Sequence, residues 1–152
     1  MGLFSFTQEI AIDLGTANTI IMCDDNIVVD EPSVVAISMA DNKMVAVGRK
    51  AQQMIGKGGN MIRTVRPLRD GVIADFYACE MMIRGMIKMI PKKARLFTPS
   101  IRMVICIPSG STEVEIRAVR DSSEHAGGRD VYMIYEPMAA RSEERRVGKE
   151  CR

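Results

Sequence analysis

Alternating apolar and polar positions near the start of the chain predict an antiparallel meander of short strands. The first two strands carry Ile10, Ile12 and the apolar run 20–22, with turn-forming residues between them. The pattern predicts three strands between residues 9 and 29, a hairpin with arms at 33–39 and 44–48, a short helix at 49–55 and a loop at 56–60. Pro32 bars regular continuation of the third strand, so the hairpin is expected to begin after it.

The later part of the chain alternates between helical and buried-strand patterns. Asp75 is suited to cap a helix running to about residue 90. Its apolar positions, which are expected to face a sheet, are Phe76, Cys79, Ile83, Met86, Ile87 and Ile90. The almost wholly apolar run 102–107 is typical of a strand covered on both faces. A capping box at 112–115 predicts a helix ending at 127–128, followed by a buried strand at 131–134 and a helix that starts at Pro137. This order predicts an α/β fold.

The turn Asp13-Leu-Gly-Thr-Ala-Asn18 has the residue types of a loop that binds nucleotide phosphates. Gly15 has no Cβ, so it can adopt φ > 0 and lets the backbone N–H groups approach an anion closely. Thr16 and Asn18 add side-chain donors, and Asp13 is suited to hold a hydrated Mg²⁺ against phosphate oxygens. The alternative is an ordinary hairpin with turn-forming residues.

Glu136 lies between a predicted buried strand and a helix that starts with proline. Sheets of α/β proteins bind ligands at the carboxyl ends of their strands, where this residue is expected. A carboxylate in the field of a helix N-terminus stays ionised and is suited to orient a water for attack on a γ-phosphate. The alternative role is that of a helix-capping carboxylate.

Two apolar segments are candidates for membrane contact. Leu96 and Phe97 are adjacent and flanked by three basic residues in the loop 91–99, a combination suited to shallow insertion into an anionic bilayer surface. Leu3 and Phe4 give the first residues of the chain a similar apolar character. The alternative for Leu96 and Phe97 is that they pack into the core beneath a solvated basic rim.

The composition fits one soluble globular domain, with 152 residues, 47% hydrophobic content and 26% charged residues. The four cysteines form no CxxC pair, and three of them lie in apolar runs, so buried free thiols in a reducing cytoplasm are expected. The sequence contains no signal peptide and no apolar run of membrane-spanning length, which also favours a cytoplasmic location.

The last twelve residues, 141–152, differ from the rest and match the translation of a common sequencing-adapter oligonucleotide, so we interpret them as an artefactual tail. This tail holds five Lys and Arg and three Glu, from chain totals of 21 basic and 19 acidic residues. The other 140 residues therefore carry 16 charges of each sign. Their zero net charge gives no indication of a nucleic-acid partner.

Four blocks resemble the MreB family of bacterial actin-like proteins. They are Ile12–Thr19, Asp30–Ile37, Ile107–Gly110 and Tyr135–Ala140, and the similarity runs from about residue 9 to residue 140. The resemblance implies the ribonuclease H-like half of the actin, Hsp70 and sugar-kinase fold, truncated, because a complete member of the family is more than twice this length. It further implies an actin-like ATPase N-terminal domain at 9–140, preceded by an N-terminal segment at 1–8. Within it, 33–65 is expected to be a small inserted subdomain, or else a plain surface excursion.

The resemblance also implies a function. ATP and Mg²⁺ would be the cofactors, bound by Asp13 through water and by Gly15, Thr16, Ala17 and Asn18, with Glu136 as the catalytic residue. The family implies filaments of self-associated subunits, peripheral at the inner face of the cell membrane, that work with membrane-bound cell-shape and cell-wall synthesis proteins. The intact protein would be a slow ATPase, whereas these 152 residues are expected to be inactive. The alternatives are a sugar kinase, an Hsp70-like ATPase, or a fragment without function.

Overall fold

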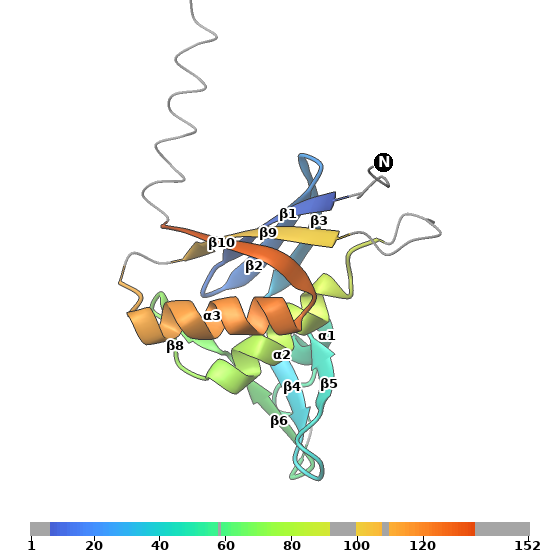
Figure 1. Ribbon diagram of the computed structural model, residues 1–152. Helices are drawn as coiled ribbons and strands as arrows, with labels where there is room; N and C mark the ends of the chain where they lie inside the picture. Colours follow the sequence, from blue (N-terminus) through green and yellow to red (C-terminus); the bar gives the residue numbers. More distant parts are fainter. Residues whose placement is uncertain (1–6, 58, 92–99, 108–109, 136–152) are drawn as a thin grey trace, which may run out of the picture.

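The computed structural model describes residues 7–57, 59–91, 100–107 and 110–135. A five-stranded main sheet has two helices, α2 and α3, packed on one face, and a smaller three-stranded sheet lies beyond these helices (Figure 1). The arrangement of helices and strands confirms the predicted α/β fold.

The main sheet combines an antiparallel meander with two parallel strands. Its spatial order is β10-β9-β1-β2-β3. The strands are β1 (Thr7–Leu14), β2 (Asn18–Cys23), β3 (Asn26–Pro32), β9 (Ser100–Ile107) and β10 (Gly128–Tyr135). β2 runs antiparallel to β1 and β3, whereas β9 is parallel to both β1 and β10. The predicted meander is confirmed, and its two turns fall where the turn-forming residues lie.

The small sheet has the order β5-β4-β6. It consists of β4 (Val35–Ser38), β5 (Met44–Val47) and β6 (Ile62–Val65), with α1 (Arg49–Gln52) between β5 and β6. The hairpin of β4 and β5 confirms the prediction for 33–48, whereas α1 is shorter than the predicted helix at 49–55. Sequence analysis missed β6 and the two-residue strands β7 (Leu68–Arg69) and β8 (Val72–Ile73), which form a separate hairpin.

Helix α2 (Phe76–Ile87) begins as predicted, because the Asp75 side chain accepts a 2.9 Å hydrogen bond from the Ala78 N–H. It ends three residues before the predicted residue 90. Phe76 was expected to face the sheet, but at the first helical position it is 42% exposed, so this part of the prediction is wrong. Gly85 allows close packing on β5, since a Cβ there would lie 2.9 Å from Val47 Cγ1.

Helix α3 (Glu113–His125) begins with the predicted capping box. Thr112 Oγ1 accepts a hydrogen bond from the Glu115 N–H at 3.3 Å, and Glu115 Oε2 accepts one from the Thr112 N–H at 2.6 Å. The bond from the Thr112 N–H is the main reason that the pKa of Glu115 lies below its ordinary value. Gly127, at φ 115, follows the helix as predicted for its C-terminal end.

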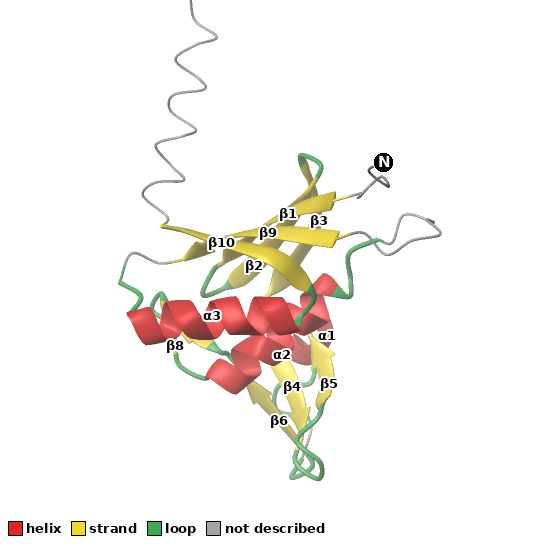
Figure 2. Ribbon diagram, viewed as in Figure 1, coloured by secondary structure: helices red, strands yellow, loops and turns green. Residues whose placement is uncertain are grey.

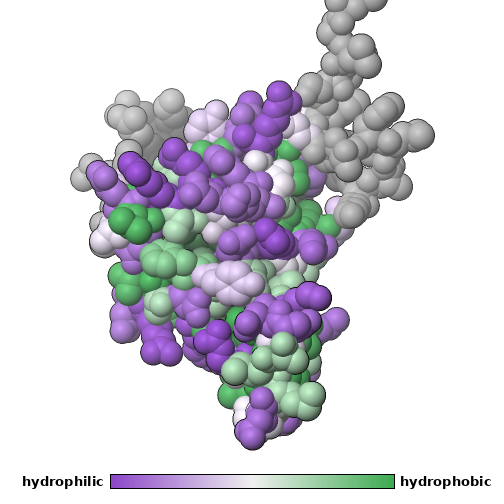
Figure 3. All heavy atoms as spheres, turned by 60° about the horizontal axis from the view of Figure 1, so that its bottom comes forward, coloured by the Kyte–Doolittle hydropathy of each residue, from purple (hydrophilic) through white to green (hydrophobic). Residues whose placement is uncertain are grey.

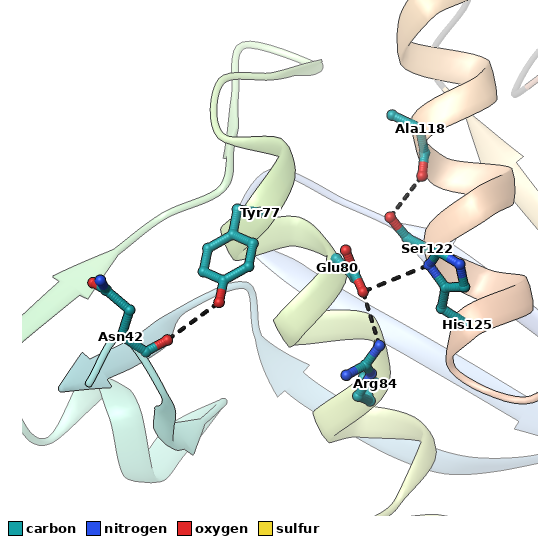
Figure 4. A network of polar contacts seen from close by, with 7 residues as sticks. All are labelled: Asn42, Tyr77, Glu80, Arg84, Ala118, Ser122 and His125. Atoms are coloured by element: carbon teal, nitrogen blue, oxygen red, sulfur yellow. Dashed lines mark hydrogen bonds and ion pairs between the residues drawn. The ribbon is translucent and has the colours of Figure 1, made fainter.

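Polar contacts join the two helices and the small sheet (Figure 4). Glu80 on α2 pairs with Arg84 at 2.8 Å and lies 3.8 Å from Nδ1 of His125 on α3. The Tyr77 hydroxyl donates a 3.3 Å hydrogen bond to the Asn42 carbonyl, in the turn between β4 and β5. These contacts are exposed, so they orient the elements more than they stabilise them.

The core lies between the main sheet and the two helices. Alternate side chains of the central strands are almost fully buried there, namely Ile10, Ile12, Leu14, Met103, Ile105 and Ile107. Figure 2 shows α2 and α3 on this side of the main sheet. The prediction that 102–107 is covered on both faces is wrong for the described part of the chain, because Arg102, Val104 and Cys106 are only partly buried. The strand β10 is likewise only half-buried, and Tyr132 is 54% exposed.

The far tip of the small sheet presents apolar side chains (Figure 3). The Met39 N–H donates a 2.9 Å hydrogen bond to the Met61 carbonyl, which holds the two residues side by side. Met39 is 53% exposed and Met61 73% exposed. These two methionines therefore belong to the surface, whereas Met82, Met86 and Met103 are fully buried in the core.

None of the helices in the described part of the chain is long and apolar enough to cross a lipid bilayer.

Candidate nucleotide-phosphate site

The turn between β1 and β2 is tight at Gly15. A Cβ added to Gly15 would lie 2.4 Å from the Asn18 carbonyl oxygen, too close for any side chain. Glycine is required here because of this close approach. The positive φ that the sequence allowed for does not occur at Gly15. Thr16, Ala17 and Asn18 are exposed, so their side chains are open to a ligand.

Ser33 supports this turn from the interior. Its hydroxyl donates a 2.6 Å hydrogen bond to the Gly15 carbonyl and lies 2.9 Å from the Thr19 hydroxyl. Its backbone N–H donates a 2.8 Å bond to the Ala17 carbonyl. Ser33 is fully buried and Thr19 is 1% exposed, so both hydroxyls depend on this contact. Sequence analysis did not place Ser33 at the site, and the only local signal is a serine between Pro32 and an apolar run.

A second support comes from the hairpin of β7 and β8. The Gly71 N–H donates a 3.0 Å hydrogen bond to Thr16 Oγ1. Because Thr16 accepts this bond, its own hydroxyl hydrogen remains available for another acceptor, such as a phosphate oxygen. Gly71 has φ 75 and Asp70 has φ 50, so the hairpin turn that contacts Thr16 uses left-handed backbone at two successive positions. The separation of 55 positions between the two partners explains why sequence analysis missed this contact.

Asn18, the fourth predicted phosphate-loop residue, is oriented by a neighbouring strand. Its side-chain amide donates a 3.1 Å hydrogen bond to Asp30 Oδ1, on β3. The amide carries two N–H hydrogens, so this bond leaves one of them available. The Asp30 carboxylate therefore fixes the direction of a donor at the edge of the turn.

Asp13 lies at the carboxyl end of β1, where the parallel strands of the main sheet end together. It is in register with Cys106 on β9, and Cys106 is in register with Ile134 on β10. Asp13 is exposed between the buried Ile12 and Leu14, so its carboxylate points away from the helix-covered face. This edge is where α/β sheets bind ligands.

The residues at this edge suit Mg²⁺ held largely by water and phosphate. In the part of the chain that the structure describes, no three His, Cys, Asp or Glu residues come together as metal ligands. Mg²⁺ commonly keeps several waters and binds to one or two carboxylates together with substrate phosphates. A single exposed carboxylate beside a tight turn fits that mode, and Asp13 is the residue that would provide it.

Five predicted site residues lie outside the described residues, namely Glu136, Leu96, Phe97, Leu3 and Phe4. Their predicted roles stay predictions. Glu136 directly follows Tyr135, the last residue of β10, which is in register with Ile107 at the end of β9. The strand that leads to Glu136 therefore ends at the same edge as the turn.

The sheet order, the separate small sheet and the tight turn after the first strand define part of an actin-like fold. The structure is similar to the MamK double helical filament with a TM-score of 0.69 over 86% of this chain and 41% of that chain. At 18% identity this similarity concerns the fold alone. It confirms the actin-like fold that the sequence resemblance implied.

The family model of the MreB/Mbl protein matches residues 7–142, and the chain belongs to this family. It is 48% identical over 144 residues to the cell shape-determining protein MreB of Pasteurella multocida, and 43% identical over 136 residues to the cell shape-determining protein Mbl of Bacillus subtilis. These alignments cover 91% and 89% of this chain but 40% of each relative. The chain thus spans about two fifths of the length of the curated relatives it matches.

A solved structure of the same family carries a nucleotide. The chain is 32% identical to MreB 5 of Spiroplasma citri bound to AMPPNP, with a TM-score of 0.68 over 86% of this chain and 39% of that chain. The same protein bound to ADP gives a TM-score of 0.69. Family membership favours the actin-like prediction over the sugar-kinase and Hsp70-like alternatives.

Proposed function

We propose that this chain is the nucleotide-proximal part of an ATP-binding, filament-forming protein that determines cell shape. The observation that carries the proposal is the tight turn at Gly15, supported by Ser33 and Gly71 and adjacent to Asp13 at the carboxyl ends of the parallel strands. Support for the biological role comes from relatives named cell shape-determining proteins and from the nucleotide-bound Spiroplasma citri structures.

Each residue of the turn has a defined task in this proposal. The N–H groups of the turn and the Thr16 hydroxyl donate to phosphate oxygens, while Asn18 offers its remaining amide hydrogen. Asp13 holds the water shell of the metal. A bound Mg²⁺ would neutralise the charge on the phosphates. Glu136, by its place after β10, would orient the attacking water.

The proposal includes self-association and membrane contact. Subunits of the complete protein would assemble into filaments. These filaments would lie at the inner face of the cell membrane. Leu96 and Phe97, with Leu3 and Phe4, would insert their apolar side chains into the bilayer surface. Membrane-bound cell-shape and cell-wall synthesis proteins would be the partners of these filaments.

The nucleotide site can be tested with a pair of aspartate substitutions in the protein encoded by the complete gene. Asp13→Asn removes the carboxylate but keeps the shape, so we expect Mg²⁺-dependent ATP binding to weaken by about tenfold, or 1.4 kcal/mol. Asp121→Asn makes the same change on the exposed surface of α3 and is expected to bind ATP normally. Titration with a fluorescent ATP analogue, with and without Mg²⁺, measures both. Equal affinities for the two variants would contradict the role of Asp13.

A further inference from the structure

A basic cavity lies along β6, at the edge of the small sheet. It has a volume of about 510 Å³ and is lined by Arg63, Thr64, Val65, Arg66, Arg69, Asp75 and three apolar residues, Val34, Ile55 and Ala74. Its lining therefore includes three arginines and one aspartate. This volume lies within the range of pockets that bind ligands.

The arginines of the cavity are poorly neutralised. Arg63 Nη1 lies 3.9 Å from Asp75 Oδ2, at the limit of an ion pair, and the other carboxylate oxygen of Asp75 already accepts the Ala78 N–H as a helix cap. Among the described residues, Arg66 and Arg69 have no carboxylate partner, and both are exposed. The cavity therefore has an excess of positive charge in fork-shaped donors that suit carboxylates.

The same cavity borders an unpaired strand edge. In the order β5-β4-β6, strand β6 pairs only with β4, so its outer edge has no partner strand in the described part of the chain (Figure 1). Such an edge offers a row of backbone donors and acceptors to another extended chain. Pro67 lacks an N–H and limits the available edge to about the length of β6.

We propose that the edge of β6 and its arginine-lined cavity bind an extended, acidic segment of a partner protein. Backbone hydrogen bonds would add the segment to the small sheet as a fourth strand. Its carboxylates would pair with Arg66 and Arg69, and its small apolar side chains would contact Val65 and Ile55 at the cavity wall. Charge complementarity selects this occupant over a basic or neutral strand. The inference does not depend on nucleotide binding.

The opposite interpretation is that the arginines protect the edge against pairing, as charged side chains do at many sheet edges. A peptide-binding experiment with the full chain separates the two. The probe is a short fluorescent peptide in which glutamate alternates with valine. One control peptide replaces each glutamate with lysine, and another keeps the glutamates but carries N-methyl groups on alternate backbone amides, which block strand pairing.

We expect the acidic peptide to bind and both control peptides to fail. The double variant Arg66→Gln with Arg69→Gln should weaken binding by about tenfold, since two exposed ion pairs are lost. The matched variant Arg117→Gln with Arg120→Gln removes the same charge from α3 and should bind normally. Circular dichroism checks that both variants fold.

Three results would overturn the proposal. Failure of the acidic peptide to bind would assign the arginines to protection of the edge. Equal binding of the N-methylated peptide would exclude strand pairing. Displacement of the peptide by inorganic phosphate at equimolar concentration would assign the cavity to small anions instead. Loss of ATP binding in Asp13→Asn would leave each of these results unchanged, so the two proposals fail independently.

Discussion

Removal of the Ser33 hydroxyl tests the support of the candidate phosphate turn most directly. Ser33→Ala deletes the donor to the Gly15 carbonyl at 2.6 Å and the partner of the Thr19 hydroxyl at 2.9 Å. Both contacts are shielded, because Ser33 is fully buried and Thr19 is 1% exposed. The substitution therefore leaves two polar groups without their partner, in addition to losing a hydrogen bond.

The magnitude follows from the cost of unsatisfied buried polar groups. Leaving one such group unpaired costs about 1–3 kcal/mol, so we expect Ser33→Ala to lower the free energy of unfolding by about 2 kcal/mol. Thr19→Val removes only the other hydroxyl and keeps the bond to Gly15, so about 1 kcal/mol is expected. The double variant should cost about 1 kcal/mol less than the sum of the single variants, because the two residues share one contact.

Urea unfolding of the four proteins, followed by circular dichroism, gives these differences. A loss of 2 kcal/mol corresponds to a decrease of about 4–8 °C in the melting temperature of a domain of this size. Ser122→Ala is the control, since its hydroxyl only bonds to the Ala118 carbonyl within α3, and its removal should be nearly neutral. A cost below about 0.5 kcal/mol for Ser33→Ala, with additive effects in the double variant, would refute the role of Ser33 as support.

The remaining predictions concern the turn, the α3 cap and two proposed functional segments. Gly15→Ala should lower the free energy of unfolding by about 2 kcal/mol in urea titrations, because its Cβ would lie 2.4 Å from the Asn18 oxygen; a neutral effect would show that the turn relaxes easily. The lowered pKa of Glu115 means that its stabilisation is present above the ordinary glutamate pKa and is lost as the pH falls through the folded-state value. Glu115→Gln should therefore reduce the loss of stability on acidification, measured as urea midpoints at neutral pH and at about pH 3, and an unchanged acid sensitivity would contradict this. In the protein from the complete gene, Glu136→Ala should slow single-turnover ATP hydrolysis much more than it weakens ATP binding, and unchanged turnover would leave Glu136 as a helix cap. Leu96→Ser with Phe97→Ser should weaken co-sedimentation with anionic liposomes at an unchanged melting temperature, whereas a lower melting temperature with normal co-sedimentation would place the pair in the core.

Local signals explain the parts of the fold that the sequence predicted well. The Asp75 cap and the 112–115 capping box are encoded within four consecutive residues, and both occur in the structure. The strands β6, β7 and β8 were missed because they contain only two to four residues each, too few to show an alternating pattern. Their pairing depends on partners elsewhere in the chain, and hydrophobic periodicity contains no information about those partners.

The same distinction between local signals and contacts of distant residues applies to the candidate site. Gly15, Thr16 and Asn18 were predicted because they lie within four positions of the sequence and offer hydrogen-bond donors suited to phosphate. Ser33 and Gly71 were not, because their contacts with the turn connect residues 18 and 55 positions apart. The family resemblance implied the actin-like fold, the expected cofactors and the candidate roles, whereas the hydrogen bonds that hold the turn are visible only in the structure.

The two supports of the turn come from the two ends of one excursion of the chain. Ser33 lies two residues before β4, where the chain enters the small sheet, and Gly71 lies in the hairpin that follows β6, where the chain returns. The chain therefore leaves the main sheet beside the candidate phosphate turn and passes this turn again at the β7–β8 hairpin, before α2 begins. A ligand that draws the Thr16 hydroxyl away from Gly71 would alter the contact between the turn and the β7–β8 hairpin, which follows β6 in the chain.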